Sequence, residues 1–303
     1  MSRPPGMNEP EATTAEEAAA QFEALRPRLV GVAYGLLGTV AEAEDAVQDA
    51  WLRLQRSDLA EIEDLTGWLV TTTARLALDV LRSARHRRET YIGPWLPEPV
   101  ETAPDPADTL SLADSLSWAM LVVLETLSPA ERTAFVLHDV FGHTFDQVAA
   151  ALGRTPAACR KLASRARDHI ETRRPRFDVD PERHRHTVEA FARASREGDL
   201  EGLLALLDPD AVLTSDGGGL VSAARKPVHG ADKIARFLIG VNAKYPDQVK
   251  RITHVNGGLA VLMLVGGEVS SVTALGIRDG RIRTVDMIRN PEKFHGLRTT
   301  RGH

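Results

Sequence analysis

Residues 145–165 read FDQVAAALGRTPAACRKLASR, a sequence with the features of two short helices joined by a tight turn. Gly153 suits the end of the first helix because glycine readily adopts the left-handed backbone conformation. Thr155 can cap the second helix through its hydroxyl, and Pro156 fits the first helical position because no backbone N–H is needed there. This arrangement is typical of a helix-turn-helix unit.

The second of these helices is predicted to have one buried and one exposed face. Its period places an apolar stripe inward, formed by Cys159, Leu162, Ala163, Ala166 and Ile170. The residues that we predict to contact DNA are Thr155, Ala157, Arg160, Lys161, Ser164 and Arg165. Arginine can bind guanine edges bidentately in the major groove, whereas lysine suits phosphate. The alternative is an ordinary helical hairpin with a solvated basic face.

Another helical unit precedes this one, because the apolar period is helical from Glu17 to Arg88. Within it, residues 43–54 combine a complete apolar stripe with an opposite polar face. That polar face includes Asp45, Gln48, Asp49 and Arg53. A further helix begins near Thr66 and ends in a basic run over 82–88, a pattern that the helix dipole alone can also favour.

Between the two helical units, residues 91–108 read YIGPWLPEPVETAPDPAD, where five prolines prevent regular helical hydrogen bonding. Trp95 between prolines is a stiff apolar group that suits docking to a surface better than spacing alone. We therefore predict a linker over 91–111 that contacts another part of the chain.

The last hundred-odd residues differ in pattern from the helical units. After two helices come runs rich in Val, Ile and Thr, and Asn256-Gly257 and Asp279-Gly280 separate such runs as hairpin turns do. We predict an α+β domain with an antiparallel sheet over 181–296, followed by a tail over 297–303. The glycines at 217–219 permit close backbone approach, although a flexible loop between strands is the simpler reading.

Composition limits the classes of function. The formal net charge of -5 argues against coating nucleic acid by bulk charge, so any DNA contact must be local. The single cysteine excludes an internal disulfide, and no apolar run is long enough for a membrane span, so we expect a soluble cytosolic protein. Residues 1–18 are acidic and poor in large apolar groups, and we expect a mobile lead-in there.

Together these motifs resemble the extracytoplasmic-function sigma factors of bacterial RNA polymerase. Residues 19–90 resemble the sigma-2 domain, and residues 112–175 resemble sigma-4, whose helix-turn-helix reads the −35 promoter element. The resemblance implies that core RNA polymerase binds Asp45, Gln48, Asp49 and Arg53. It also implies promoter DNA contacts from Arg75, Arg82, Arg85, Arg87 and Arg88, although most of this group has Asn where Arg75 stands.

Three further segments resemble signatures of the sigma-J-like subgroup, which carries a C-terminal cone-shaped domain of the SnoaL-like, NTF2-like type. They lie in the linker, in the glycine loop and near the C-terminus. We predict a regulatory contact among Trp95, Leu96, Pro97, Glu98, Pro99, Asp216, Gly217, Gly218, Gly219, Asn290, Pro291 and Lys293. Through this contact the C-terminal domain is expected to modulate sigma activity.

Relatives of the cone-shaped domain include enzymes, so acid–base groups need separate consideration. Asp216, His229, His254 and Asp286 are candidates, but no pair has a spacing that fixes a catalytic geometry. We predict no catalytic residue, cofactor or metal site, and an unknown small-molecule ligand in the cone remains an open alternative. Two other hypotheses are a cone enzyme tethered to a DNA-binding module and a repressor that senses a ligand in the cone. The polar-faced helix over 42–55 discriminates, because a repressor needs no polymerase-docking surface separate from its helix-turn-helix.

Overall fold

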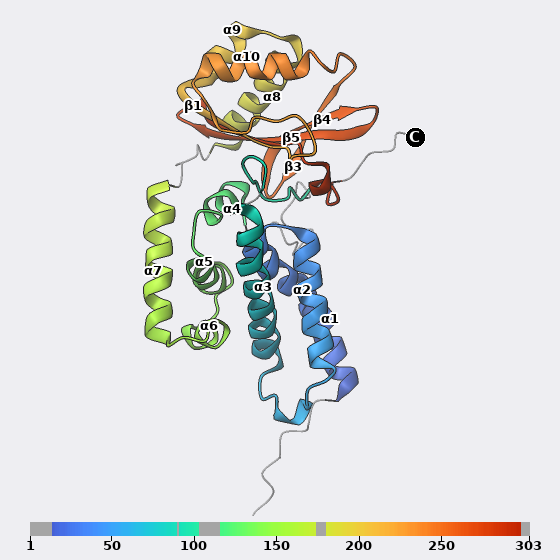
Figure 1. The fold of residues 1–303 in the computed structure, drawn as a ribbon, viewed down its shortest axis with the longest axis vertical. Coiled ribbons are helices and arrows are strands. Elements are labelled where there is room, and N and C mark those ends of the chain that lie inside the picture. Colours follow the sequence, from blue (N-terminus) through green and yellow to red (C-terminus); the bar gives the residue numbers. More distant parts are fainter. Residues whose placement is uncertain (1–13, 90, 103–115, 174–179, 298–303) are drawn as a thin grey trace, which may run out of the picture.

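The computed structural model describes residues 14–89, 91–102, 116–173 and 180–297. Two groups of helices lie together at one end of the molecule, and a sheet with its own helices lies at the other (Figure 1). The helices of the first group are α1 (Ala15–Leu37), α2 (Val40–Leu54), the 3₁₀ helix η1 (Leu59–Glu61) and α3 (Leu65–Glu89). Those of the second are α4 (Trp118–Leu124), α5 (Pro129–Phe135), the π-helical turn η3 (Val136–Val140), α6 (Phe145–Leu152) and α7 (Pro156–Arg173).

Helix α1 begins earlier than predicted. Thr14 and Glu17 form a capping box, in which the Thr14 side chain accepts from the Glu17 backbone and the Glu17 carboxylate accepts from the Thr14 backbone. The predicted lead-in over 1–18 is therefore too long, because the helix starts at Ala15; residues 1–13 lie outside the described residues. At its other end α1 stops at Gly38, which has a left-handed φ of 76°.

The helix-turn-helix has the predicted geometry. Gly153 ends α6 with a φ of 62°, and the Thr155 hydroxyl accepts a hydrogen bond from the Ala158 backbone N–H at 3.2 Å. Pro156 is the first residue of α7, and all five residues of the predicted inward stripe are buried. Cys159 is thus a core residue.

The two helical groups share one hydrophobic core. Helix α3 packs against α5 and α6, and α1 contacts α5 and η3. At the centre of this interface Arg132 is 2% exposed and donates to the carbonyls of Leu36 and Leu124, at 2.8 and 2.9 Å. Its guanidinium also pairs with the Glu125 carboxylate at 2.7 Å. Separation of the two groups would leave this buried guanidinium without part of its hydrogen bonds, which is costly for a charged group.

The C-terminal domain comprises three helices, six strands and a 3₁₀ turn in the described residues. They are α8 (Pro181–Glu197), α9 (Leu200–Leu206), β1 (Leu207–Asp216), β2 (Val228–His229), α10 (Ala231–Asn242), β3 (Val249–Val255), β4 (Gly258–Val265), β5 (Glu268–Arg278), β6 (Arg281–Ile288) and η4 (Pro291–Lys293). The sheet order is β2-β1-β6-β5-β4-β3. The sheet is mixed, because β1 runs parallel to β6, and the predicted antiparallel sheet is wrong at this pair.

The predicted hairpins are present. Asn256 and Gly257 join β3 to β4, Asp279 and Gly280 join β5 to β6, and all four have positive φ, as this turn type requires. The helices of this domain cover one face of the sheet, and the other face turns toward α4 and the linker (Figure 1). The sheet therefore contacts the helical groups directly through its second face.

Candidate nucleic-acid and polymerase interfaces and the linker contact

Helix α7 presents its predicted DNA-contacting residues to solvent. Thr155, Ala157, Arg160, Lys161, Ser164 and Arg165 are all exposed. The Arg160 guanidinium lies over the Phe145 ring at 5.4 Å from its centroid, so the side chain is supported by α6. Arg167, further along the helix, pairs with Asp139 at 2.7 Å and is less available for DNA.

The basic residues of α3 are arranged differently. Arg75 donates from Nε and Nη2 to the carbonyl of Ala150 at the end of α6, at 3.0 and 2.6 Å. Arg82 is exposed and pairs with Asp79 at 3.4 Å. The side chains of Arg85, Arg87 and Arg88 lie outside the described residues. In this arrangement Arg75 contacts the helix-turn-helix and not solvent alone.

Helix α2 has the predicted polar face. Asp45, Gln48, Asp49 and Arg53 are exposed, and Ala43, Ala46, Val47, Ala50 and Leu54 are buried on the opposite side. Because none of the four exposed residues is needed for the core, this face is available to a partner.

The linker meets the C-terminal domain at one buried carboxylate. Asp216, at the end of β1, is 0% exposed. Its Oδ2 accepts from the Leu96 backbone N–H at 2.9 Å and from Lys293 Nζ at 2.7 Å, and its Oδ1 accepts from the Tyr91 hydroxyl at 2.6 Å. We call Tyr91, Leu96, Asp216, Asn290 and Lys293 the linker contact. It joins three segments that are distant in the sequence.

Lys293 connects the same three segments. It is 5% exposed, its ammonium also donates to the Leu96 carbonyl, and it lies 3.9 Å from the centroid of the Trp95 ring. A buried ammonium is stable only when hydrogen bonds and charges compensate its lost hydration, and here a carboxylate, a carbonyl and an aromatic face do so.

The glycines beside Asp216 allow the tail and the linker to approach closely. Gly218 and Gly219 have φ of 65° and 76°, a region that side chains disfavour. A Cβ on Gly218 would lie 2.5 Å from Asn290 Nδ2, and a Cβ on Gly219 would lie 3.0 Å from Ile92. Asn290 Nδ2 donates to the Tyr91 hydroxyl at 3.1 Å. Pro291 begins η4, the turn that carries Lys293.

On its other side the linker contacts the first helical group. The Glu98 carboxylate accepts from the Val40 N–H at 2.8 Å, at the start of α2, and the Glu98 backbone N–H donates to the Gly38 carbonyl at 2.8 Å. The Tyr34 hydroxyl donates to the Glu98 carbonyl at 2.7 Å and accepts from Asn256 of the C-terminal domain at 2.9 Å. Burial raises the pKa of Glu98 above its usual range. Pro97 and Pro99 flank Glu98 and are buried with it.

Tyr34, Tyr91 and Asn256 belong to this network but were not singled out from the sequence. Tyr34 lies in a predicted helix and Tyr91 in the predicted linker, where the expected contact was placed on Trp95 to Pro99. Asn256 was interpreted only as a turn residue. The available signal was the tyrosine hydroxyl, because a tyrosine that is buried usually has a hydrogen-bond partner for this group.

The four acid–base candidates lie at separate places. Asp216 is in the linker contact, Asp286 on β6 is buried, His229 on β2 is exposed and His254 on β3 is half-buried. Across the described ranges, no group of three or more His, Cys, Asp or Glu side chains is arranged to hold a metal ion. None of the described helices is long and apolar enough to cross a membrane.

Family comparisons assign each part of the chain. Residues 21–87 match the family described as sigma-70 region 2, residues 117–170 match sigma-70 region 4, and residues 188–288 match the SnoaL-like domain. The pairing of regions 2 and 4 defines a sigma factor, a protein of transcription initiation.

The relatives specify the kind of sigma factor. The ECF RNA polymerase sigma factor SigJ of Mycobacterium tuberculosis is 44% identical over 290 residues, which cover 91% of this chain and 93% of SigJ. The probable ECF sigma factor SigI of the same species is 37% identical over 288 residues, covering 93% of this chain and 97% of SigI. The crystal structure of SigJ matches with a TM-score of 0.74 at 40% identity, over 93% of this chain and 100% of that one.

The chain therefore belongs to the ECF RNA polymerase sigma factors and carries a C-terminal SnoaL-like domain. The predicted family and fold class are confirmed. Sigma factors act by binding core RNA polymerase and promoter DNA and are not enzymes, so the readings as a tethered enzyme and as a repressor are set aside.

Proposed function

We propose that the SnoaL-like domain modulates this sigma factor by holding the linker, and thereby the sigma-2 and sigma-4 domains, in a compact closed state. To recognise promoter elements that lie apart along DNA, the two domains must separate from this arrangement. Contacts that exist only in the closed state favour that state and oppose the change.

The Asp216 carboxylate is the observation that carries this proposal. It accepts hydrogen bonds from two linker residues, Tyr91 and Leu96, and from Lys293 of the tail. The same linker segment caps α2 through Glu98. Such extensive polar burial is more than a spacer needs, and it connects the SnoaL-like domain to the sigma-2 domain through the linker.

Core polymerase must compete with the contact between the linker and the SnoaL-like domain. Because linker and SnoaL-like domain are parts of one chain, their contact forms at a high effective concentration, roughly millimolar. Differential contact energy of about 1.4 kcal/mol changes the ratio of closed to open molecules tenfold. Loss of one buried charge partner exceeds this, since such losses typically cost about 3–5 kcal/mol.

In-vitro transcription with core polymerase tests the regulation. Lys293→Gln removes the ammonium from the linker contact, and Lys233→Gln on the exposed face of α10 removes an equal charge elsewhere. We expect Lys293→Gln, Trp95→Ala and truncation after Arg289 to raise promoter output at limiting polymerase, because each weakens the closed state. Lys233→Gln should match wild type.

The outcome that contradicts the proposal is equal promoter output from wild type, Lys293→Gln, Trp95→Ala and the truncated chain. Circular dichroism and elution volume of each protein establish equal folded concentration. A variant that lost its fold would be replaced by Asn290→Ala, which removes one hydrogen bond to Tyr91 from the same contact.

We further propose that the polar face of α2, formed by Asp45, Gln48, Asp49 and Arg53, contacts core polymerase. Charge reversal of Asp45 and Asp49 to Lys should weaken polymerase binding at least about tenfold, while exposed helix positions change stability little. The double variant Glu61→Lys with Glu63→Lys, at two other exposed positions, makes the same change of charge and is the matched control. Undiminished binding of the double variant in a pull-down with core polymerase would exclude this face.

A further inference from the structure

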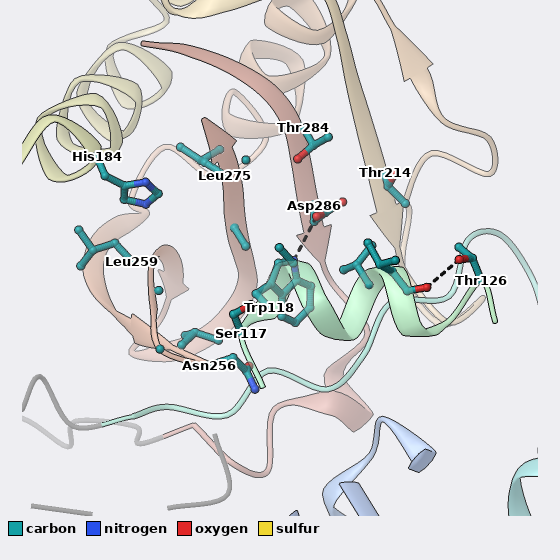
Figure 2. Close-up of a pocket in the computed structure, with 18 residues that line it drawn as sticks. Ser117, Trp118, Thr126, His184, Thr214, Asn256, Leu259, Leu275, Thr284 and Asp286 are labelled. Carbon is teal, nitrogen blue, oxygen red and sulfur yellow. Dashed lines mark hydrogen bonds between the residues drawn. The ribbon is translucent and has the colours of Figure 1, made fainter. Parts of the chain in front are cut away.

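A cavity of about 390 Å³ lies between part of the SnoaL-like sheet and helix α4 of sigma-4. Strands β1, β5 and β6 form its floor, the turn between β3 and β4 closes one side, and α4 forms the facing wall (Figure 2). The volume lies within the range of small-molecule sites. None of the residues assigned above to polymerase or DNA lines this cavity. Of the residues named above in the linker network, Asn256 lines it, and its side-chain amide is already bonded to Tyr34 and to the Val100 backbone.

Its lining is mostly apolar. The main apolar contributors are Val122, Val123, Val255, Leu259, Ala274 and Leu275. Side chains from both domains thus surround one apolar space, which favours a molecule that buries hydrocarbon against them.

The polar groups that line this space include one carboxyl. Asp286 on β6 is buried, with 9% of its surface exposed, and in the described structure its one side-chain hydrogen bond comes from the indole Nε1 of Trp118, at 3.1 Å. A carboxylate has lone pairs for several donors, so this group retains capacity for another. Burial raises the pKa of Asp286 to about 6, and the carboxyl is mainly ionised at neutral pH.

Three further polar side chains line the cavity around Asp286 and across from it. Thr214, Thr284 and His184 have no hydrogen-bond partner within the described part of the chain, and Figure 2 shows them around the same space. Burial lowers the pKa of His184, which favours the neutral imidazole. A bound molecule can therefore meet one charged acceptor and several neutral partners.

We propose that this cavity binds an uncharged, mostly apolar molecule that donates a hydrogen bond, such as a hydroxyl, to Asp286. An anion would be repelled by the carboxylate. A cation would lose its hydration in an apolar site with one counter-charge, a cost that pairing often fails to offset. A neutral hydroxyl meets the acceptor without that cost.

Because α4 forms one wall, such a molecule contacts sigma-4 and the SnoaL-like domain together. It binds the closed arrangement better than a separated one and so stabilises that arrangement. Only this consequence rests on the proposed regulation; binding in the cavity does not.

Calorimetry with the full chain and a pair of nearly isosteric probes tests the site. Naphthylmethanol carries the hydroxyl, and ethylnaphthalene substituted at the same position has a methyl group in its place. At about pH 8 Asp286 is ionised, and the alcohol should bind at least about tenfold more tightly than the hydrocarbon, as a hydrogen bond to a charged group typically contributes. Asp286→Asn should reduce that ratio severalfold, and Thr284→Phe, which fills the cavity, should abolish binding of both probes.

Asp210→Asn, an exposed position at the outer end of β1, is the control and should bind both probes as wild type does. Three results would overturn the site: no saturable binding of naphthylmethanol, equal affinity of wild type for the two probes, or unchanged binding to Thr284→Phe. Tighter binding of naphthylmethylamine than of the alcohol would overturn the uncharged class. The transcription comparison of wild type with Lys293→Gln and Trp95→Ala uses no probe, so a failure of probe binding is distinct from a failure of the proposed regulation.

Discussion

At the scale of single residues, two buried aspartates of the SnoaL-like domain have opposite surroundings. Asp216 meets Lys293, a backbone N–H and a tyrosine hydroxyl, whereas Asp286 meets only the indole of Trp118 among the described residues. A carboxylate with a buried counter-charge is stable in its ionised form, and one without it is destabilised on ionisation. Asp286 should therefore make stability depend on pH.

The direction of that dependence follows from the pKa of Asp286, raised by burial from 3.8 to about 6. The folded state takes up the proton more readily than the unfolded state, so ionisation lowers the free energy of unfolding. This decrease in the free energy of unfolding is absent below about pH 4. It is nearly complete above about pH 6, where it is roughly 3 kcal/mol.

Asp286→Asn removes this titration and retains a carbonyl acceptor for Trp118. Relative to wild type, the variant should gain free energy of unfolding as pH rises from about 4 to about 8, by up to about 3 kcal/mol. Urea unfolding at a series of pH values measures the difference, with Asp210→Asn as the exposed control. A difference that stays constant across this range would show that Asp286 does not titrate in this way.

At the scale of elements, local rules predicted the helices well. Capping residues and apolar period indicated α2, α3 and the α6–α7 turn, because these signals depend on residues a few positions apart. The positive φ of Asn256-Gly257 likewise confirmed a predicted turn. The start of α1 was missed because a capping box outweighs an acidic, small-residue composition.

Contacts between residues that are distant in the sequence were harder to predict from the sequence. The parallel β1–β6 pair joins the first and last strands, and nothing in a local sequence pattern specifies that register. The segments of the linker contact were predicted from resemblance, but Tyr91, the contribution of Glu98 to α2 and the contact of Trp118 with Asp286 depend on how three domains pack.

For helix α7 we predict different effects on DNA binding from two exposed cations. Arg165→Ala, which removes an exposed arginine from the predicted reading face, should cost about 1–3 kcal/mol on promoter DNA and less on random DNA. Lys161→Ala should weaken both alike and reduce the salt dependence, because phosphate contacts carry no sequence information. Holoenzyme binding at several salt concentrations measures both effects. Equal loss on both DNAs for Arg165→Ala would exclude base reading by that residue.

At the scale of the whole molecule, the closed arrangement has two sources. Sigma-2 and sigma-4 share a hydrophobic core with Arg132 at its centre, and the SnoaL-like domain contacts the linker between them as well as α4. The Arg75 bond to Ala150 also places a predicted DNA-contacting residue against sigma-4. In the compact state, Arg75 is therefore less accessible to DNA.

The distance between the sigma domains in the free protein is the most direct test that the SnoaL-like domain maintains this state. Spin labels at Gln55→Cys, after α2, and Asp168→Cys, on α7, report it when the buried Cys159 is replaced by Ala. Double electron–electron resonance should give one narrow, short distribution for the otherwise unchanged chain and for Lys233→Gln. Lys293→Gln and Trp95→Ala should add a population at longer distances. The same narrow distribution in all four proteins would contradict the claim that the linker contact keeps the sigma domains together.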